Sequence, residues 1–490
     1  MAVVTKDPAI FDIGDYIAKH SRAVDTDKYK NNLLIYKKDS VNVTEFKEVV
    51  RRVEQHFNAK FDSNDTEKTQ ERLRMQHEAI TGVKKAISFY KNEITDFLRK
   101  ENLLQSSFPS YYHSLTDAIY HDLYGLGPLV TWYDYPNSQA AHIMGTSIFF
   151  EIGDRLIKQT VEFENIDRVK ELVRALVLKD SHSQINEYNP KLEISMEDGS
   201  RVTMFVPPLS RQISITFRRF VVSKLTFEDQ AMKSTIDKQA ISLFRALSII
   251  RPNTGITGPV KSGKSTFLNT VYGERNHDQK IVCVEKHYEL GLGLHYPGRP
   301  LDELVATEQQ LLNLFPSILR TDFIYLIVGE LRSVEAELCM LGAERGSMGL
   351  LFTFHNTFPV NIPGQIARLI LDAFSNRKYE SELVRAADNI NIIITMEQME
   401  DKSKKVTGVL EVRLDPVSLL ISVHEIIRYD DITDTWQYKF DVSEQLLKRL
   451  RKNNSKWTET FINELKRLER LSPIIGDTVT YSTESRLLNR

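Results

Sequence analysis

The sequence has 490 residues, which is too long for one compact core and predicts two to four domains. Hydrophobic residues make up 41% and charged residues 27%, as in an ordinary globular protein, and the net charge of −2 excludes the basic excess that usually marks a nucleic-acid-binding chain. No secretory signal is visible at the start, and no apolar run approaches the roughly 18 residues that a membrane span requires. Cys283 and Cys339 lie in apolar segments and are expected to be reduced core residues, so a cytoplasmic location is predicted.

Residues 1–105 are predicted to form an N-terminal helical region. Apolar residues recur at helical spacing within 49–57 and again within 83–98. The polar run 62–71 between them is expected to be a connection or the start of a helix. A structural or docking role is expected for this region.

Residues 106–230 are predicted to form an α+β domain with an antiparallel sheet. Residues 197–200 (Glu-Asp-Gly-Ser) have the composition of a hairpin turn, and a helix is expected around 169–176. A linker is expected at 231–238. The short β-prone runs of this domain are Ser147–Ile152, Lys191–Met196, Arg201–Val206 and Ile213–Phe217.

Residues 239–440 alternate between helical and strand patterns, which predicts a parallel sheet with crossover helices. Continuous apolar runs of strand length indicate strands that are buried on both faces. These runs are Ile281–Glu285, Phe323–Val328, Leu350–Phe354 and Asn391–Met396. A β-rich pair is expected at 409–430, and residues 441–490 are predicted to be a basic, helical C-terminal tail.

One segment of this domain matches the phosphate-binding pattern G-x-x-x-x-G-K-[ST] in full. It consists of Gly258, Pro259, Val260, Lys261, Ser262, Gly263, Lys264 and Ser265. Its glycines let backbone N–H groups surround the phosphates, Lys264 can reach the β- and γ-phosphates, and the Ser265 hydroxyl can bind Mg²⁺. Thr266 continues into a helix whose N-terminus favours the same anion.

Two polar residues follow apolar strand runs further along the chain. Glu330 comes after Phe323–Val328 and can orient an attacking water or hold the water shell of the metal, although a solvated loop glutamate is the alternative. His355 comes after Leu350–Phe354, where it can lie beside the ligand crevice and sense the γ-phosphate. A structural histidine is the alternative there.

Taken together, these segments resemble the type II/IV secretion ATPase family, the hexameric traffic ATPases of secretion systems and pili. The resemblance covers roughly residues 120–435 and is greatest for the branch that serves tight-adherence pili and type IV secretion. The motifs that carry it, in chain order, are Gly125–Leu129, Asp198–Val202, Pro207-Pro208, Thr216–Phe220, Ile281–Glu285 with Glu289, Val328–Arg332, Glu335-Ala336, and His355 with Pro359 and Arg368.

The resemblance implies a RecA-like P-loop ATPase domain that binds ATP and Mg²⁺. Lys264 and Ser265 then hold phosphate and metal, and Glu330 polarises the attacking water. Glu285 and Glu289, which fall on the acidic box of the family, support the metal and the water. The residues expected near Mg²⁺ are therefore Ser265, Glu285 and Glu330.

The resemblance also implies a catalytic role for His355 and an interface role for two arginines. His355 reports on the γ-phosphate, and Arg218 or Arg219 reaches the nucleotide from the preceding α+β domain. A planar, permanently charged guanidinium suits that task, although surface arginines on a strand edge are the alternative. The implied assembly is a homo-oligomer, a hexamer, that lies at the cytoplasmic face of the membrane and acts on an inner-membrane platform protein.

Three departures from the family pattern motivate a second hypothesis. Lys286 follows Glu285 where the acidic box usually has aspartate, Ser347 replaces a histidine, and Asp322 replaces an arginine before the catalytic strand. Each change is expected to remove a polar group near the site. The alternative function is therefore a nucleotide-binding regulatory or structural subunit that hydrolyses ATP weakly.

A motor that acts on nucleic acid is a third hypothesis and is disfavoured. Such a motor needs a basic channel lined with aromatic residues, and no basic concentration is present outside the C-terminal tail. The basic tail residues are Lys448, Arg449, Arg451 and Lys452. They are expected to form a solvated helix face, with binding to acidic lipid or nucleic acid as the alternative.

Overall fold

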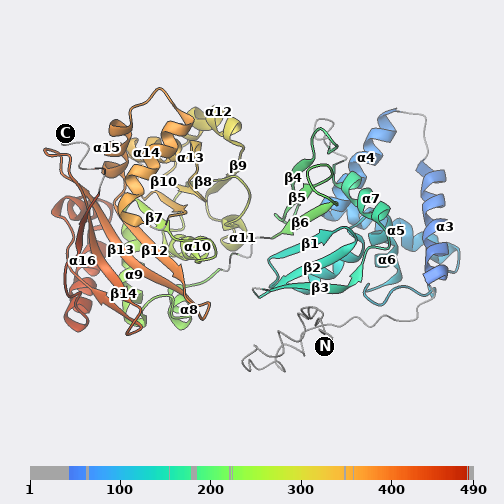
Figure 1. The fold of residues 1–490 in the computed structure, drawn as a ribbon, viewed down its shortest axis with the longest axis horizontal. Helices are drawn as coiled ribbons and strands as arrows, with labels where there is room; N and C mark the ends of the chain where they lie inside the picture. Colours follow the sequence, from blue (N-terminus) through green and yellow to red (C-terminus); the bar gives the residue numbers. More distant parts are fainter. Residues whose placement is uncertain are drawn as a thin grey trace, which may run out of the picture. The chain divides into compact units, whose positions relative to one another are not determined.

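The computed structural model describes residues 43–61, 66–153, 155–177, 185–219, 222, 224–346, 349–356, 358–482 and 484. The chain divides into two compact units between Arg218 and Arg219 (Figure 1). The predicted helical region before residue 43, Phe220 of one family motif and the divergent Ser347 lie outside the described residues.

The described part of the first unit, from residue 43, contains helices whose apolar faces share one core. These helices are α3 (Val43–Phe61), α4 (Thr66–Thr81), α5 (Lys84–Lys100) and α6 (Leu115–Leu123). Val53, Phe57, Ile94 and Leu98 are buried in this core, as the helical spacing of the sequence predicted. Much of the polar run 62–71 belongs to α4, which starts at Thr66, and residues 62–65 lie outside the described residues.

A six-stranded antiparallel sheet completes the first unit. Its strand order is β3-β2-β1-β6-β5-β4. The strands are β1 (Ala140–Met144), β2 (Ser147–Ile152), β3 (Arg155–Glu162), β4 (Lys191–Ser195), β5 (Arg201–Phe205) and β6 (Ser214–Arg218). The short helix η1 (Gly127–Asp134) and helix α7 (Ile166–Val177) pack on its core. The antiparallel sheet, the helix and the hairpin turn, in which Gly199 has φ +80°, are as predicted from the sequence.

The second unit is built on a mixed sheet with a RecA-like centre. Its strands run in the order β15-β14-β13-β12-β7-β11-β10-β8-β9. The strands from β12 to β9 in this order are parallel, and β13, β14 and β15 extend the sheet in antiparallel fashion. They are β7 (Thr254–Thr257), β8 (Ile281–Glu285), β9 (Leu301–Val305), β10 (Tyr325–Val328), β11 (Leu351–Phe354), β12 (Ile392–Gln398), β13 (Lys404–Leu414), β14 (Ile421–Asp430) and β15 (Thr435–Tyr438), while β16 (Val479–Tyr481) pairs with β14.

Helices cover both faces of this sheet, and the strands are buried from both sides. Successive residues of β8 show the alternation, since Cys283 belongs to one core and its neighbours Val282 and Val284 belong to the other. The helices on the Cys283 side include α8 (Phe227–Met232), α9 (Ile241–Ile250), α10 (Lys264–Glu274) and α16 (Glu444–Leu471). Those on the other side are α12 (Glu308–Ile318), α13 (Val334–Glu344), α14 (Ile362–Ala373) and α15 (Tyr379–Asn389). Both cysteines are buried and free, as predicted.

Two segments are integrated into the second unit more closely than their sequence suggested. Residues 231–238, predicted as a linker, end α8 and lead into the short helix η2 (Lys238–Ala240), where Ile236 is buried in the core. Within the predicted tail, α16 buries Phe461, Leu465 and Leu468 in the same core. Among the described residues, no helix is both long and apolar enough to cross a membrane.

Candidate functional site

The phosphate-binding segment connects the carboxyl end of β7 with the first turn of α10. Gly258 has φ +150°, and a Cβ there would lie 2.0 Å from the carbonyl oxygen of Met396 on β12. Gly263 has φ +93° and forms the N-cap of α10, while Lys261 adopts a left-handed φ of +67°. Only glycine fits the first of these positions, because its backbone passes so close to a neighbouring strand.

Lys264, the first residue of α10, folds its side chain back over the loop. Its Nζ donates hydrogen bonds to the carbonyl oxygens of Gly258 at 2.9 Å and Pro259 at 2.7 Å. Burial lowers the pKa of Lys264 to about 8, although the nearby Glu330 carboxylate opposes this shift. A partly desolvated ammonium group of this kind is stabilised when an anion binds beside it.

The loop also provides what a phosphate group requires. The first amides of α10, at Lys264, Ser265 and Thr266, have no intrahelical acceptor by their position and concentrate positive potential. The side chains of Ser265 and Thr266 are partly exposed there, whereas the Ser262 hydroxyl is buried without a hydrogen-bond partner. The residues present therefore fit a nucleotide phosphate and its metal.

Glu330 and His355 reach the same edge of the sheet from neighbouring strands. Strand β11 pairs with β7 on one side and β10 on the other, so the carboxyl ends of all three strands lie at one edge. The Nε2 atom of His355 lies 3.5 Å from Glu330 Oε1, and its Nδ1 lies 3.3 Å from Lys264 Nζ. Burial lowers the pKa of His355, Lys264 lowers it further, and Glu330 opposes both effects. The structure thus brings together three residues that are 66 and 25 positions apart in the sequence.

Arg332 and Thr353 fix the position of the Glu330 segment. Arg332 donates a hydrogen bond to Glu330 Oε2 at 3.1 Å. The Thr353 hydroxyl on β11 donates to the carbonyl oxygen of Gly329, and the N–H of Leu331 donates to the carbonyl oxygen of Thr353. Arg332 lies in a family motif, but no role was predicted for it from the sequence.

Glu285, at the end of β8, is a buried carboxyl group beside this segment. Its Oε1 accepts hydrogen bonds from the backbone N–H groups of Glu289 at 3.2 Å and Leu290 at 3.0 Å. A Cβ at Gly329 would lie 2.9 Å from the same oxygen, so Glu285 packs directly against the backbone that precedes Glu330. Burial raises the pKa of Glu285 to about 8 and so favours the neutral form of the carboxyl group, while the two backbone N–H groups oppose this shift.

The remaining predicted residues occupy different parts of the chain. Glu289 is partly exposed in the loop after β8. Arg218 is exposed at the end of β6, and Arg219 is the first residue of the second unit, so their interface role stays a prediction. Asp322 is exposed before β10, at the opposite end of that strand from Glu330. The expectation that this departure removes a polar group near the site was therefore wrong, because β10 separates the two residues.

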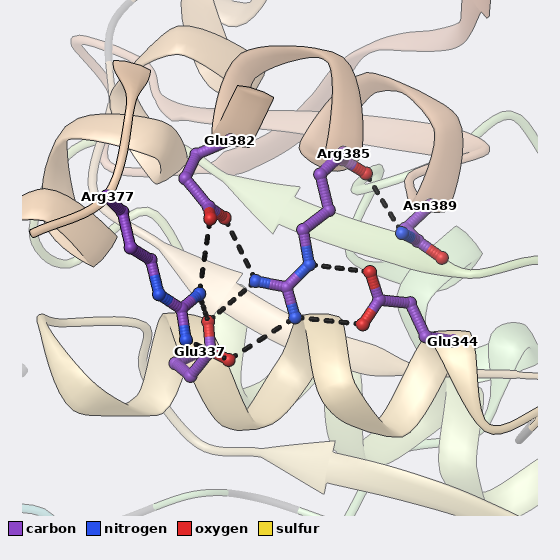
Figure 2. A network of polar contacts seen from close by, with 6 residues as sticks. All are labelled: Glu337, Glu344, Arg377, Glu382, Arg385 and Asn389. Carbon is purple, nitrogen blue, oxygen red and sulfur yellow. Dashed lines mark hydrogen bonds and ion pairs between the residues drawn. The ribbon is translucent and has the colours of Figure 1, made fainter. Parts of the chain in front are cut away.

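A buried ion-pair network joins the crossover helices that follow the Glu330 and His355 strands (Figure 2). Glu337 on α13 is 2% exposed and accepts hydrogen bonds from Arg377, at 2.6 and 2.8 Å, and from Arg385 on α15, at 2.7 and 3.3 Å. Arg385 also contacts Glu344 and Glu382. These contacts fix α13 and α15 to one another on the face of the sheet that they cover.

A separate cavity of about 810 Å³ lies in the first unit. Its lining includes Gly125, Gly127 and Pro128 from one family motif, together with Tyr112 and Arg168. None of the residues predicted to bind nucleotide lines it. The cavity is therefore distinct from the phosphate-binding loop of the second unit.

A phosphate-binding loop at the carboxyl edge of a RecA-like sheet, with a carboxylate and a histidine at the ends of the next strands, defines the class of P-loop nucleotide-binding proteins. The sequence model of the family described as type II/IV secretion system protein matches residues 125–395, which is more than half of the chain. The chain belongs to this family. The matched range includes the loop, Glu285, Glu330 and His355.

Several known proteins are similar to the chain. The uncharacterized protein MJ0900 of Methanocaldococcus jannaschii is 24% identical over 318 residues, which cover 59% of this chain and 55% of that protein. The chain therefore spans about half the length of this curated relative. Among solved structures, the VirB11 ATPase of the Brucella suis type IV secretion system is 19% identical with a TM-score of 0.32, covering 58% of this chain and 92% of that one. The Legionella pneumophila ATPase DotB is 14% identical with a TM-score of 0.42, covering 71% and 92% respectively.

Proposed function

We propose that this protein is a Mg²⁺-dependent ATPase that drives a secretion or pilus-assembly machine. The observation that carries the proposal is the convergence of Lys264, Glu330 and His355 on a formed phosphate-binding loop, in a chain that belongs to the type II/IV secretion system family. Glu330 lies at the end of the strand where a P-loop protein needs an acidic residue.

Two groups of residues carry out this function: one binds the phosphates, and the other activates the attacking water. In this proposal, the α10 amides and Lys264 bind the phosphate groups, and the Ser265 hydroxyl holds the metal. Bound Mg²⁺ supplies charge neutralisation for the phosphates. Glu330 orients and polarises the attacking water, and Arg332 and the Thr353 contacts hold the Glu330 segment in place.

Glu285 and His355 link the site to the state of the ligand. A cation near Glu285 favours the ionised form of a carboxyl group that burial otherwise keeps neutral. His355 contacts both Lys264 and Glu330, so a change at either residue alters its surroundings. We infer that these contacts distinguish the triphosphate from the diphosphate, which is what a motor requires of its site.

We further propose that the protein works as a hexamer on the inner face of a membrane, where it moves a platform protein. The branch that serves tight-adherence pili and type IV secretion is the one that its motifs favour. Arg218, the last residue of the preceding unit, or Arg219, the first residue of the second unit, completes the nucleotide site in this proposal. The family membership supports it, together with the position of both arginines at the junction of the units.

The test is Mg²⁺-dependent phosphate release by the purified protein and by two variants. Lys264→Ala and Glu330→Gln are each expected to lower turnover by about 100-fold or more. Lys233→Ala and Glu400→Gln remove the same charges from exposed positions and should leave turnover unchanged. Sizing with a non-hydrolysable ATP analogue should show a nucleotide-stabilised ring. A wild-type protein that binds no nucleotide, or that stays monomeric with it, would contradict the proposal.

The second candidate is a subunit that binds nucleotide but hydrolyses it weakly. Lys286 favours it, because a lysine replaces an acidic residue next to Glu285 and the structure shows Glu285 as the buried carboxyl group there. Tight nucleotide binding without turnover by the wild-type protein would select this function. Restored turnover in Lys286→Asp would then assign the cause.

A further inference from the structure

The β12–β13 hairpin packs against the phosphate-binding loop. None of the sequence motifs includes this hairpin. At the start of the loop, the Met396 carbonyl oxygen of β12 leaves no room for a Cβ on Gly258. At the end of the loop, a Cβ on Gly263 would lie 3.1 Å from Lys404 Cδ and 3.6 Å from Met396 Cε. The hairpin therefore contacts both glycines of the motif.

Lys404, the first residue of β13, makes a polar contact with the middle of the loop. Its Nζ donates a hydrogen bond to the carbonyl oxygen of Lys261 at 2.5 Å. Lys261 is the loop residue whose φ of +67° is unfavourable for a side chain other than glycine. A charge-assisted hydrogen bond at its carbonyl oxygen stabilises this conformation.

The direction of this contact matters for anion binding. A loop that cradles phosphate must turn its N–H groups inward and its carbonyl oxygens outward. Lys404 binds a carbonyl oxygen from the hairpin side, while Lys264 binds the carbonyl oxygens of Gly258 and Pro259. The two lysines together donate hydrogen bonds to the carbonyl oxygens of three loop residues.

The neighbouring residue anchors the hairpin in the core. Lys405 points to the opposite face of β13, as expected for the next residue of a strand, and is 5% exposed. Its Nζ lies 2.8 Å from Asp434 Oδ1 and 5.3 and 5.1 Å from the ring centroids of Tyr429 and Trp436. This aromatic and carboxylate cage fixes the start of β13, and with it the position of Lys404.

We propose that Lys404 is a positioning residue for nucleotide binding, which holds the phosphate-binding loop in its anion-accepting conformation. The inference rests on the proposed nucleotide-binding function and extends it to the β12–β13 hairpin. Lys404 acts through the Lys261 carbonyl group and is distinct from the residues that contact phosphate directly.

The test compares the affinity of three variants and the wild-type protein for Mg²⁺-ADP by calorimetry. Lys404→Met removes the ammonium but keeps the apolar stem over Gly263, and we expect it to bind about tenfold more weakly. Lys404→Arg restores a donor and should recover affinity to within about twofold. Lys402→Asn removes the same charge from an exposed position of the same turn, where its φ of +71° suits asparagine, and should bind like the wild type.

Two further readouts separate positioning from general stability. The thermal unfolding midpoint of Lys404→Met without nucleotide should match that of the wild type, whereas amide exchange in residues 258–266 should be faster. Unchanged affinity in Lys404→Met, or a loss equal to that of Lys402→Asn, would overturn the inference while leaving nucleotide binding intact. A wild-type protein that binds no Mg²⁺-ADP would instead overturn the proposed function on which the inference rests.

Discussion

The ion-pair network around Glu337 gives a prediction whose magnitude follows from the burial of this carboxylate. Glu337 is 2% exposed and receives four hydrogen bonds from Arg377 and Arg385. The change Glu337→Gln keeps the shape of the side chain but places an amide group against two guanidinium groups (Figure 2). The amide NH₂ group then faces guanidinium donors, while Glu344 and Glu382 remain as the carboxylates that balance the two arginines.

Removing one partner of a buried ion pair costs about 3–5 kcal/mol. Arg385 keeps Glu344 and Glu382 as partners in this variant, and Arg377 keeps Glu382, so the lower end of that range applies. We therefore expect a loss of about 3 kcal/mol in the stability of the α13–α15 contact, which corresponds to an opening equilibrium about 100-fold more favourable.

Native-state amide exchange of α13 and α15 measures this opening directly, even in a chain of two units whose global unfolding need not be two-state. The matched control is Glu344→Gln, in which the lost carboxylate also binds Arg385 but is 39% exposed. Exposed pairs contribute about 0–1 kcal/mol, so exchange should accelerate at most about fivefold. Equal acceleration in the two variants would refute the argument that burial sets the magnitude.

Three predictions concern the site itself. The Glu285 carboxyl group should contribute a loss of stability to the ligand-free protein as the pH rises from about 4.5 to about 8, because burial raises its pKa in the folded state to about 8. In thermal unfolding, the stability of Glu285→Gln relative to the wild type should therefore increase across this window, and a constant difference would contradict the burial of an acid. Gly258→Ala places a methyl group 2.0 Å from the Met396 carbonyl oxygen and should weaken nucleotide binding at least tenfold in a titration with a fluorescent analogue, so normal binding would contradict the close contact. His355→Ala should lower kcat about tenfold but change the Kd for Mg²⁺-ADP less than twofold, since Lys264 keeps its two loop carbonyl partners, and equal effects on both constants would place His355 in ground-state binding instead.

The sequence predicted the central parallel strands of the second unit well but gave no sign of the edge strands β3 and β9, for a physical reason. Strands β8, β10, β11 and β12 are buried on both faces, so each appears as a continuous apolar run. Strand β3 is exposed or half-exposed at every position, because it is an edge strand with little apolar surface to bury. Strand β9 is the edge strand on the parallel side of the sheet in the second unit, and it is also only partly buried.

In short segments, the spacing of apolar residues also fails to distinguish a helix that covers the core from a linker. Helix α8 has six residues, too few for a helical period to be visible, and its place in the core depends on contacts with α9 and η2. Helix α16 shows the opposite case. Its apolar stripe was visible in the sequence, but the surface that the stripe covers is formed largely by α9, which lies some 200 residues earlier in the chain.

The same distinction applies to the candidate site. The loop from Gly258 to Ser265 is contiguous, so its residues could be assigned from spacing alone, and Glu330 and His355 follow strands whose burial is visible in the sequence. Lys404 contacts the loop across 143 positions through a hairpin that carries no motif, and nothing in its own segment marks it.

A residue that binds phosphate needs a particular side chain at a particular point of the loop, and spacing reveals that requirement. A residue that supports the loop without contacting phosphate needs only a hydrogen-bond donor at the correct position of a neighbouring strand. That position is set by the packing of Lys405 and by the β12–β13 pairing, which has an irregularity after Thr395. The support of a site is therefore much less visible in the sequence than the site itself.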